Sequence, residues 1–214
     1  MSDDLTSQAC TIASNDGTTL EAVIDRGASD AIIEAVAAIA HPHPQYGGDL
    51  HNNVVGALQR GLAAAGAITV RFNFRGVGAS GGTHSGGARE REDYLAALDA
   101  AAALDGSAPL YACGYSFGAD VALTCVAPGI TAWIVVAPPL RLFADEQYVA
   151  ATDARPKHII AGVHDQHASA DMVRAATAGW RNVVVHPVEM ADHFFGGTTA
   201  RVSEIVTGIV VDAG

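Results

Sequence analysis

Gly114-Tyr115-Ser116-Phe117-Gly118 lies between an apolar run, Leu110 to Cys113, and a helix-like stretch, Ala119 to Ala127. The apolar run is typical of a buried strand, so the pentapeptide turns the chain sharply from a strand into a helix that begins at Phe117. Glycines two residues before and after the serine allow the strand and the helix to approach without a clash of Cβ atoms. This context is that of a nucleophile elbow, which holds Ser116 at the carboxyl end of a strand.

Two later residues complete the set of side chains that such a serine needs. Asp165 follows the apolar run His158 to Gly162, and His193 follows the run Val183 to Val188, so each lies shortly after a predicted strand. The chain order serine, acid, histidine is the one that accompanies a nucleophile elbow. Two other interpretations stay open, in which Asp165 is a solvated turn residue or helix cap and His193 is a loop histidine. Weaker candidates for the acid are Asp145, Asp171 and Asp192.

The three residue types fit one kind of chemistry. A serine hydroxyl is a poor nucleophile at neutral pH, so a neutral imidazole must take its proton during attack and return it to the leaving group. His193 would do this for Ser116. The carboxylate of Asp165 would fix the imidazole tautomer and stabilise the imidazolium that forms. No cofactor is needed, and none is expected.

The composition indicates one acidic domain. With 214 residues, of which 50% are hydrophobic, the chain is long enough to bury a substantial core, and residues 1–214 are expected to form a single domain. The formal net charge of −11 and the single lysine, Lys157, argue against nucleic acid or an anionic membrane as a partner. Residues 1–4 do not begin a secretory signal and no apolar run reaches about 18 residues, so a cytoplasmic protein is expected. A homodimer is left open.

Strand-like and helix-like segments alternate along the rest of the chain. Two strand-like runs around turn residues 15–17 predict an amino-terminal antiparallel hairpin. The later alternation predicts an α/β fold, with a mostly parallel central sheet and helices on both faces. Ligands of such sheets bind outside the carboxyl ends of the strands, where the three candidate residues are placed. The expected strands are residues 10–14, 20–25, 35–40, 68–72, 110–113, 132–136, 157–162 and 182–188, and the expected helices are residues 52–65, 89–104, 117–127, 169–178 and 198–211.

Three blocks of sequence have counterparts in one superfamily. His41 to Gly48 resembles a His-Pro loop that follows the third strand, Arg71 to Ser80 resembles an Arg-Gly-x-Gly-x-Ser loop that follows the fourth, and Gly114 to Gly118 is the elbow. On these blocks the whole chain resembles the α/β-hydrolase superfamily, and within it small cap-less bacterial hydrolases related to dienelactone hydrolases and Xaa-Pro dipeptidyl-peptidase-like proteins. The resemblance implies the α/β-hydrolase fold and a serine hydrolase.

The resemblance also implies an oxyanion hole built from two backbone N–H groups. One belongs to the residue after the nucleophile, Phe117, and the other to the His-Pro loop, where His43 holds the corresponding position. Pro42 and Pro44 have no N–H to donate. If the loop folds differently, Gln45 or Tyr46 would supply the second donor.

The stretch from Pro138 to Pro156 bears on the substrate. It has room for a loop and one short helix, so no large cap domain is expected and the pocket should be open to small or extended substrates. Tyr115, Tyr46 and Phe194 are the candidate substrate-binding residues. The side chains that are candidates to line an apolar acyl pocket are those of Tyr115, Phe117, Trp133, Leu142, Phe143, Phe194 and Phe195. The competing interpretation is that most of the aromatic ones belong to the core.

The histidines and one arginine allow rival interpretations. His41, His43 and His51, or the cluster His164 to His167, have residue types that bind zinc, although no metal site is predicted. The competing interpretation is that His41 and His51 satisfy buried loop carbonyls. Arg75 is expected to bridge loops rather than to hold substrate.

These observations predict a serine hydrolase that cleaves a small-molecule ester, thioester or amide through an acyl-enzyme on Ser116. A peptidase or lactone hydrolase of the same fold is the nearest alternative. A non-catalytic ligand-binding member of the superfamily is the alternative of a different class.

Overall fold

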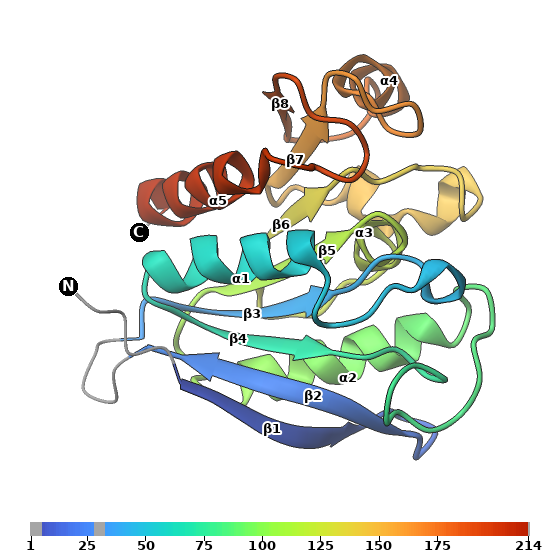
Figure 1. The fold of residues 1–214 in the computed structure, drawn as a ribbon, viewed down its shortest axis with the longest axis vertical. Helices are drawn as coiled ribbons and strands as arrows, with labels where there is room; N and C mark the ends of the chain where they lie inside the picture. The colour runs from blue at the N-terminus through green and yellow to red at the C-terminus, as the bar shows by residue number, and fades with distance from the viewer. Residues whose placement is uncertain (1–5, 28–32, 214) are drawn as a thin grey trace.

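One twisted sheet of eight strands forms the centre of the computed structural model, which describes residues 6–27 and 33–213 (Figure 1). The strand order is β1-β2-β4-β3-β5-β6-β7-β8; β2 pairs antiparallel with β1 and β4, and the other neighbours are parallel. The predicted fold class and amino-terminal hairpin are therefore confirmed. The strands are β1 (Thr6–Ala13), β2 (Thr19–Arg26), β3 (Ala35–Ala40), β4 (Ala67–Phe72), β5 (Leu110–Tyr115), β6 (Ile130–Val136), β7 (Lys157–Gly162) and β8 (Val183–Val188).

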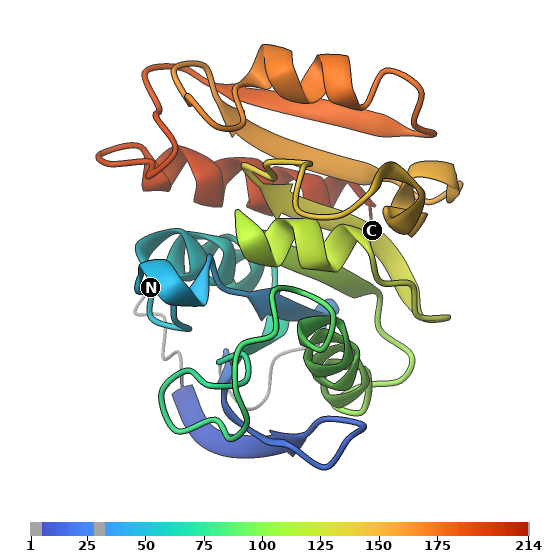
Figure 2. The same ribbon diagram turned by 90° about the vertical axis from the view of Figure 1, so that its right-hand side faces the viewer.

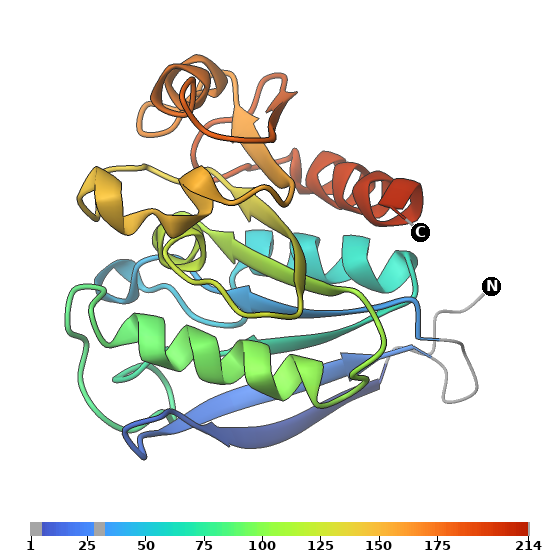
Figure 3. The ribbon, with the colours of Figure 1, turned by 180° about the vertical axis from the view of Figure 1, so that it is seen from behind.

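Helices cover both faces of the sheet. The helices α1 (Asn53–Ala64) and α5 (Thr199–Ala213) lie in front of it in Figure 1, and α2 (Glu90–Ala102) lies in front of it in Figure 3. Figure 2 shows the sheet between α1 and α2. The shorter helices are α3 (Phe117–Leu123), which follows β5, and α4 (Ala170–Ala176), which packs against β7 and β8. Among the described residues, no helix combines the length and the apolar character needed to cross a membrane.

Local sequence explains where several helices begin and end. Asn52 caps α1, because its side chain accepts a hydrogen bond from the N–H of Val54. The helix after the elbow was predicted to reach residue 127, but α3 ends at Leu123. Thr124 caps it and donates its hydroxyl to the Val121 carbonyl, and the proline at position 128 disfavours a helical residue before it.

The segment between β6 and β7 carries no cap domain, as expected. It contains two short 3₁₀ helices, η2 (Asp145–Gln147) and η3 (Val149–Thr152), rather than the one short helix predicted. A third, η1 (Pro44–Tyr46), lies in the loop after β3. The carboxyl ends of β5, β7 and β8 are therefore left uncovered by any inserted domain in the part of the chain that the structure describes.

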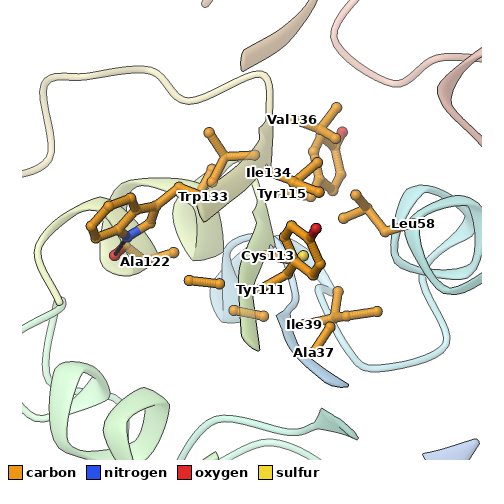
Figure 4. Packing of buried hydrophobic residues seen from close by; sticks show 14 of the residues in the cluster. Ala37, Ile39, Leu58, Tyr111, Cys113, Tyr115, Ala122, Trp133, Ile134 and Val136 are labelled. Atoms are coloured by element: carbon orange, nitrogen blue, oxygen red, sulfur yellow. Dashed lines mark hydrogen bonds between the residues drawn. The ribbon is translucent and has the colours of Figure 1, made fainter. Parts of the chain in front are cut away.

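The core lies on both faces of the central strands (Figure 4). Every residue of β3 and of β5 is buried, which agrees with the unbroken apolar run predicted for β3. Trp133 on β6 is fully buried, and its indole N–H donates to the Ala122 carbonyl at 3.1 Å. The prediction that Trp133 lines an acyl pocket is therefore wrong. Phe195, predicted for the same pocket, is also fully buried.

Candidate active site

Ser116 sits at the turn between β5 and α3 with a strained backbone. Its φ of 52° and ψ of −115° place a non-glycine residue where side chains are disfavoured, and its N–H donates to the Val136 carbonyl at 2.9 Å. The two glycines of the pentapeptide are required by close approach. A Cβ on Gly114 would collide with the Gly118 carbonyl, and one on Gly118 would lie 2.6 Å from the Ala40 carbonyl oxygen.

Three side chains predicted from separate segments meet at this rim. Ser116 Oγ lies 3.0 Å from His193 Nε2, and His193 Nδ1 lies 2.7 Å from Asp165 Oδ2. Because the carboxylate only accepts, His193 carries its proton on Nδ1, and its Nε2 is free to accept the serine proton. The arrangement has the connectivity of a Ser–His–Asp triad.

Asp165 is held as an ionised, buried acceptor. Its Oδ1 accepts the N–H groups of His167 at 2.7 Å and Ala168 at 2.9 Å, so Oδ2 is left for His193. Burial favours the neutral acid, but the hydrogen bonds from His193 and these two amides outweigh it and lower the pKa of Asp165. The carboxylate is thus charged at neutral pH and oriented before any substrate arrives.

Two features of the neighbouring strands position the loop that carries His193. The Tyr115 hydroxyl donates to the His193 carbonyl at 2.7 Å, and burial raises the pKa of Tyr115, so the hydroxyl keeps its proton. Gly162 at the end of β7 lets the loop approach, because a Cβ there would collide with the Ala191 carbonyl. Tyr115 lines the pocket as predicted for a substrate-binding residue, yet its polar group is used to position His193.

The loop after β3 brings His43 next to the elbow. The parallel pairing of Ala40 with Gly114 sets β3 beside β5, and the His43 ring packs on the Phe117 ring with centroids 5.0 Å apart. Phe117 is the first residue of α3, where helix N–H groups lack intrahelical partners.

Hydrogen bonding distinguishes between the predicted second donors. The Gln45 N–H donates to His43 Nδ1 at 3.2 Å, and the Tyr46 N–H donates to the His43 carbonyl at 3.1 Å. Both alternatives are therefore engaged within the loop. Among the described residues, the His43 N–H has no acceptor in the protein, so His43 stays the candidate.

His41 joins this loop to the loop after β4. It is fully buried, its Nδ1 donates to the Pro42 carbonyl at 2.6 Å, and its Nε2 accepts the Phe74 N–H at 3.0 Å. Burial, the largest influence, lowers the pKa of His41 to about 4. The prediction that it satisfies a buried carbonyl is confirmed. His51 is exposed, so the same prediction for His51 is wrong.

The contacts of the other rival candidates are those of structural or surface residues. Both ring nitrogens of His41 are used within the protein, and the described residues contain no group of three His, Cys, Asp or Glu side chains placed to hold a metal ion. Arg75 is buried and bound to Asp93, as expected of a residue that bridges loops. The three rival acids are accounted for elsewhere: Asp145 is exposed in η2, Asp171 pairs with Arg174, and Asp192 accepts the Phe194 N–H.

A cavity of about 850 Å³ opens directly on Ser116 and His193. This volume is in the range of small-molecule sites. Tyr46 and Phe194 lie on its wall and are 87% and 67% exposed, so they form its mouth. The structurally described lining comprises Pro42, His43, Tyr46, Gly47, Gly48, Asn52, Tyr115, Ser116, Phe117, Asp120, Pro139, Arg141, Leu142, His167, His193 and Phe194.

Several lining residues were missed or misplaced by sequence reasoning. Phe143 was expected in the pocket but packs on the Tyr148 ring instead, whereas its neighbour Leu142 does line it. Asp120 and Arg141 were not predicted. The spacing of Asp120, one helical turn after Ser116, was the available signal for the first, because residues four apart share a helix face. We find no sequence signal for Arg141.

Comparison with solved structures places the fold in a class. A serine hydrolase homologue from Coxiella burnetii is 29% identical with a TM-score of 0.84, over 98% of both chains. A serine hydrolase without a lid from Xanthomonas campestris is 27% identical with a TM-score of 0.83, over 97% of this chain and 94% of that one. A ferulic acid complex of Est1E from Butyrivibrio proteoclasticus, at 20% identity and a TM-score of 0.79 over 95% and 98% of the chains, has the same fold. The chain is an α/β-hydrolase. Its similarity to serine hydrolases supports hydrolase activity.

A sequence relative gives the particular family. The chain is 32% identical to the uncharacterized protein RP471 of Rickettsia prowazekii over 187 residues, which is 82% of this chain and 78% of that protein. It belongs to the same family as that protein. No family profile matches the chain.

Proposed function

We propose that the protein is a serine hydrolase that cleaves carboxylic esters or thioesters through an acyl-enzyme on Ser116. The observation that carries the proposal is the hydrogen-bonded series from Ser116 Oγ to His193 Nε2 at 3.0 Å and from His193 Nδ1 to Asp165 Oδ2 at 2.7 Å. A serine held on a strained turn beside an imidazole that is itself bonded to a carboxylate has the arrangement that nucleophilic catalysis requires.

The residues would act in a fixed order. Ser116 Oγ attacks the carbonyl carbon while His193 Nε2 takes its proton, and Asp165 stabilises the imidazolium without being protonated. The N–H groups of Phe117 and His43 would stabilise the oxyanion of the tetrahedral intermediate. His193 then protonates the leaving alcohol or thiol, and a water molecule activated by the same imidazole releases the acid.

The open pocket supports a small or extended substrate. The cavity of about 850 Å³ reaches the serine without an inserted domain above it, among the described residues. Its wall combines Tyr46, Leu142 and Phe194 with polar groups beside the serine, which suits an ester carbonyl flanked by apolar atoms. Peptide and lactone substrates remain the alternatives within this mechanism.

Active-site labelling tests the proposal. A fluorophosphonate probe should modify Ser116, and p-nitrophenyl butyrate should be hydrolysed by the wild type but not by Ser116→Ala, since the nucleophile carries more than about 10⁴-fold of the rate. Ser107→Ala is the matched control, because Ser107 is an exposed loop residue bonded to Asp105. Labelling that persists in Ser116→Ala would remove Ser116 from the mechanism. Absence of labelling and of turnover in the folded wild type would indicate a ligand-binding protein instead.

A further inference from the structure

The pocket has an uneven charge. Its described lining residues include one carboxylate, Asp120, and one guanidinium, Arg141. The other titratable side chains of this lining are histidines and tyrosines. Asp120 is fully buried, and its carboxylate accepts backbone N–H groups, whereas the Arg141 side chain is exposed. A ligand in the pocket therefore meets a cation in a molecule whose formal net charge is −11. An anionic ligand would be attracted at this mouth and repelled by most of the remaining surface.

The backbone on either side of Arg141 is hydrogen-bonded to α3, the helix that follows Ser116. Asp120 Oδ1 accepts the Leu140 N–H at 3.0 Å, and its Oδ2 accepts the Leu142 N–H at 3.4 Å. Asp120 is itself fixed, because its N–H donates to the Ser116 carbonyl at 3.0 Å. Leu140 has a φ of 54°, a strained value for leucine that the surrounding hydrogen bonds must maintain. Arg141 is thus presented from a defined position relative to Ser116.

His167 lies between the Arg141 guanidinium and His193. Arg141 Nη2 is 3.3 Å from His167 Nδ1, and the His167 ring packs edge-on against the His193 ring with centroids 5.1 Å apart. Within the described part of the chain, no carboxylate lies within ion-pair distance of Arg141. By contrast, Arg75 and Arg155 each have an aspartate partner at 2.6 Å. Apart from the contact of Nη2 with His167, the donors of Arg141 are therefore available to a ligand.

We propose that Arg141 determines specificity by binding an anionic group of the substrate, so that the substrate class is an ester or thioester that also carries a carboxylate or a similar anion. This inference rests on the proposed hydrolase function. A planar guanidinium suits a carboxylate because two parallel N–H groups match its two oxygens. Because Arg141, Ser116 and His193 line one cavity and His167 contacts both Arg141 and His193, the bound anion would lie a short acyl or alcohol chain away from the reacting carbonyl.

Matched esters test the assignment by turnover. The acyl arm compares monomethyl adipate with methyl hexanoate, and the alcohol arm compares the butyryl ester of glycolic acid with ethyl butyrate. Titration of released acid gives kcat/KM for each ester. We expect the wild type to prefer the anionic member of one arm, and Arg141→Gln to reduce that preference about tenfold. Arg141→Lys should retain part of it, and added salt should weaken it.

Arg60→Gln is the charge-matched control. Arg60 is an exposed residue of α1 that does not line the cavity, so its loss lowers the net charge equally and should leave the preference as in the wild type. An unchanged preference in Arg141→Gln, or an equal loss in Arg60→Gln, would overturn the assignment. The arm that shows the preference identifies whether the anion belongs to the acyl or the alcohol part.

A binding measurement separates this inference from the proposed function. In Ser116→Ala, which cannot turn over, titration calorimetry with monomethyl adipate and with the butyryl ester of glycolic acid should give tighter binding than the neutral esters. Adding Arg141→Gln should remove the difference. Discrimination in Ser116→Ala together with no esterase activity in the wild type would overturn the hydrolase and retain the anion site. Equal binding of anionic and neutral esters would overturn the anion site whatever the activity.

Discussion

The hydrogen-bonded network around Arg75 and the one around Ser116 both follow the carboxyl ends of strands. They differ in whether their polar groups reach a cavity. Arg75, just after β4, donates from its backbone and its guanidinium to Asp93 and reaches Asp16 at 2.9 Å and Ser14 at 3.3 Å. Arg75 is 1% exposed, so its guanidinium is enclosed by these partners, of which Asp16 lies at the surface. The network of Ser116 instead ends in a cavity. The Ser116 hydroxyl lies on the wall of that cavity, and so does His43, whose N–H has no acceptor among the described residues.

The comparison teaches that hydrogen-bond saturation, rather than a conspicuous motif, distinguishes structure from function here. Both networks contain charged residues in glycine-rich loops, and both hold segments far apart in the chain together. In the first, every strong donor has a carboxylate or hydroxyl partner, so loss of a member should cost stability. In the second, Ser116 and His193 line the cavity and the His43 N–H has no acceptor among the described residues, so loss of a member should cost activity.

The largest effect is expected from Asp165→Asn. The amide oxygen can still accept the N–H groups of His167 and Ala168, but the NH₂ group cannot accept from His193 Nδ1. The imidazole then takes the wrong tautomer, and kcat on p-nitrophenyl butyrate should fall about 10⁴-fold with little change in the unfolding midpoint. Asp192→Asn is the control, because Asp192 is exposed and merely accepts the Phe194 N–H. A comparable loss of activity in the control would contradict the assignment.

The Arg75 network should respond in the opposite way. Asp93→Asn removes the charge opposite the buried Arg75 guanidinium and turns one acceptor into a donor, so the free energy of unfolding should fall by about 4 kcal/mol. Denaturant unfolding measures this loss, and kcat of the folded fraction should change far less. Asp212→Asn, an exposed change at the end of α5, should leave stability unaltered. If Asp93→Asn instead lost activity without stability, the distinction between the networks would be wrong.

A smaller effect should isolate the His43 N–H. The φ of His43 is −56°, a value that proline adopts, so His43→Pro removes the N–H with its own φ kept. His43→Ala removes the ring and keeps the N–H. We expect kcat of His43→Pro to be about 10²-fold lower than kcat of His43→Ala. This corresponds to a loss of about 3 kcal/mol of transition-state stabilisation, as for the loss of one oxyanion donor. Equal activity of the two variants would assign the second donor elsewhere.

The elements of this site that could be predicted are those fixed by position along the chain. Ser116, Asp165 and His193 each follow an apolar run, and the carboxyl ends of parallel strands share one edge of the sheet. Their approach therefore follows from topology. The antiparallel hairpin and the two helix layers follow from the same alternation of strand and helix patterns.

The elements that could not be predicted depend on side-chain direction and on strained backbone. β6 is buried on both faces, so alternation gave no sign that Trp133 faces the core rather than the cavity. The pocket wall at Arg141 depends on positive φ values at Ala137 and Leu140, which residue propensities disfavour. The exposure of His51 likewise depends on how one loop turns.

The smallest effect concerns His41, a buried histidine whose two ring nitrogens both bond to backbone groups. The pKa of His41 is lowered from 6.5 to about 4 in the folded protein, so its contribution to stability is complete above pH 6.5 and is lost as the pH falls through 4. The loss amounts to up to about 3 kcal/mol. In His41→Gln this dependence should disappear, so the stability difference from wild type should narrow from pH 7 to pH 4.

The difference between the two proteins must be measured because Asp120 opposes this trend. Burial, the largest influence, raises the pKa of Asp120 from 3.8 to about 6, so its contribution is present below pH 3.8 and is lost as the pH rises through 6. The two titrations partly cancel in the wild type, and other groups titrate in the same window, such as His158, whose pKa burial lowers to about 4, so the wild-type curve alone does not isolate His41. Subtracting the His41→Gln curve from the wild-type curve removes the Asp120 contribution common to both. A difference that stays constant from pH 7 to pH 4 would mean that His41 is protonated in the fold, which its acceptor bond from Phe74 does not allow.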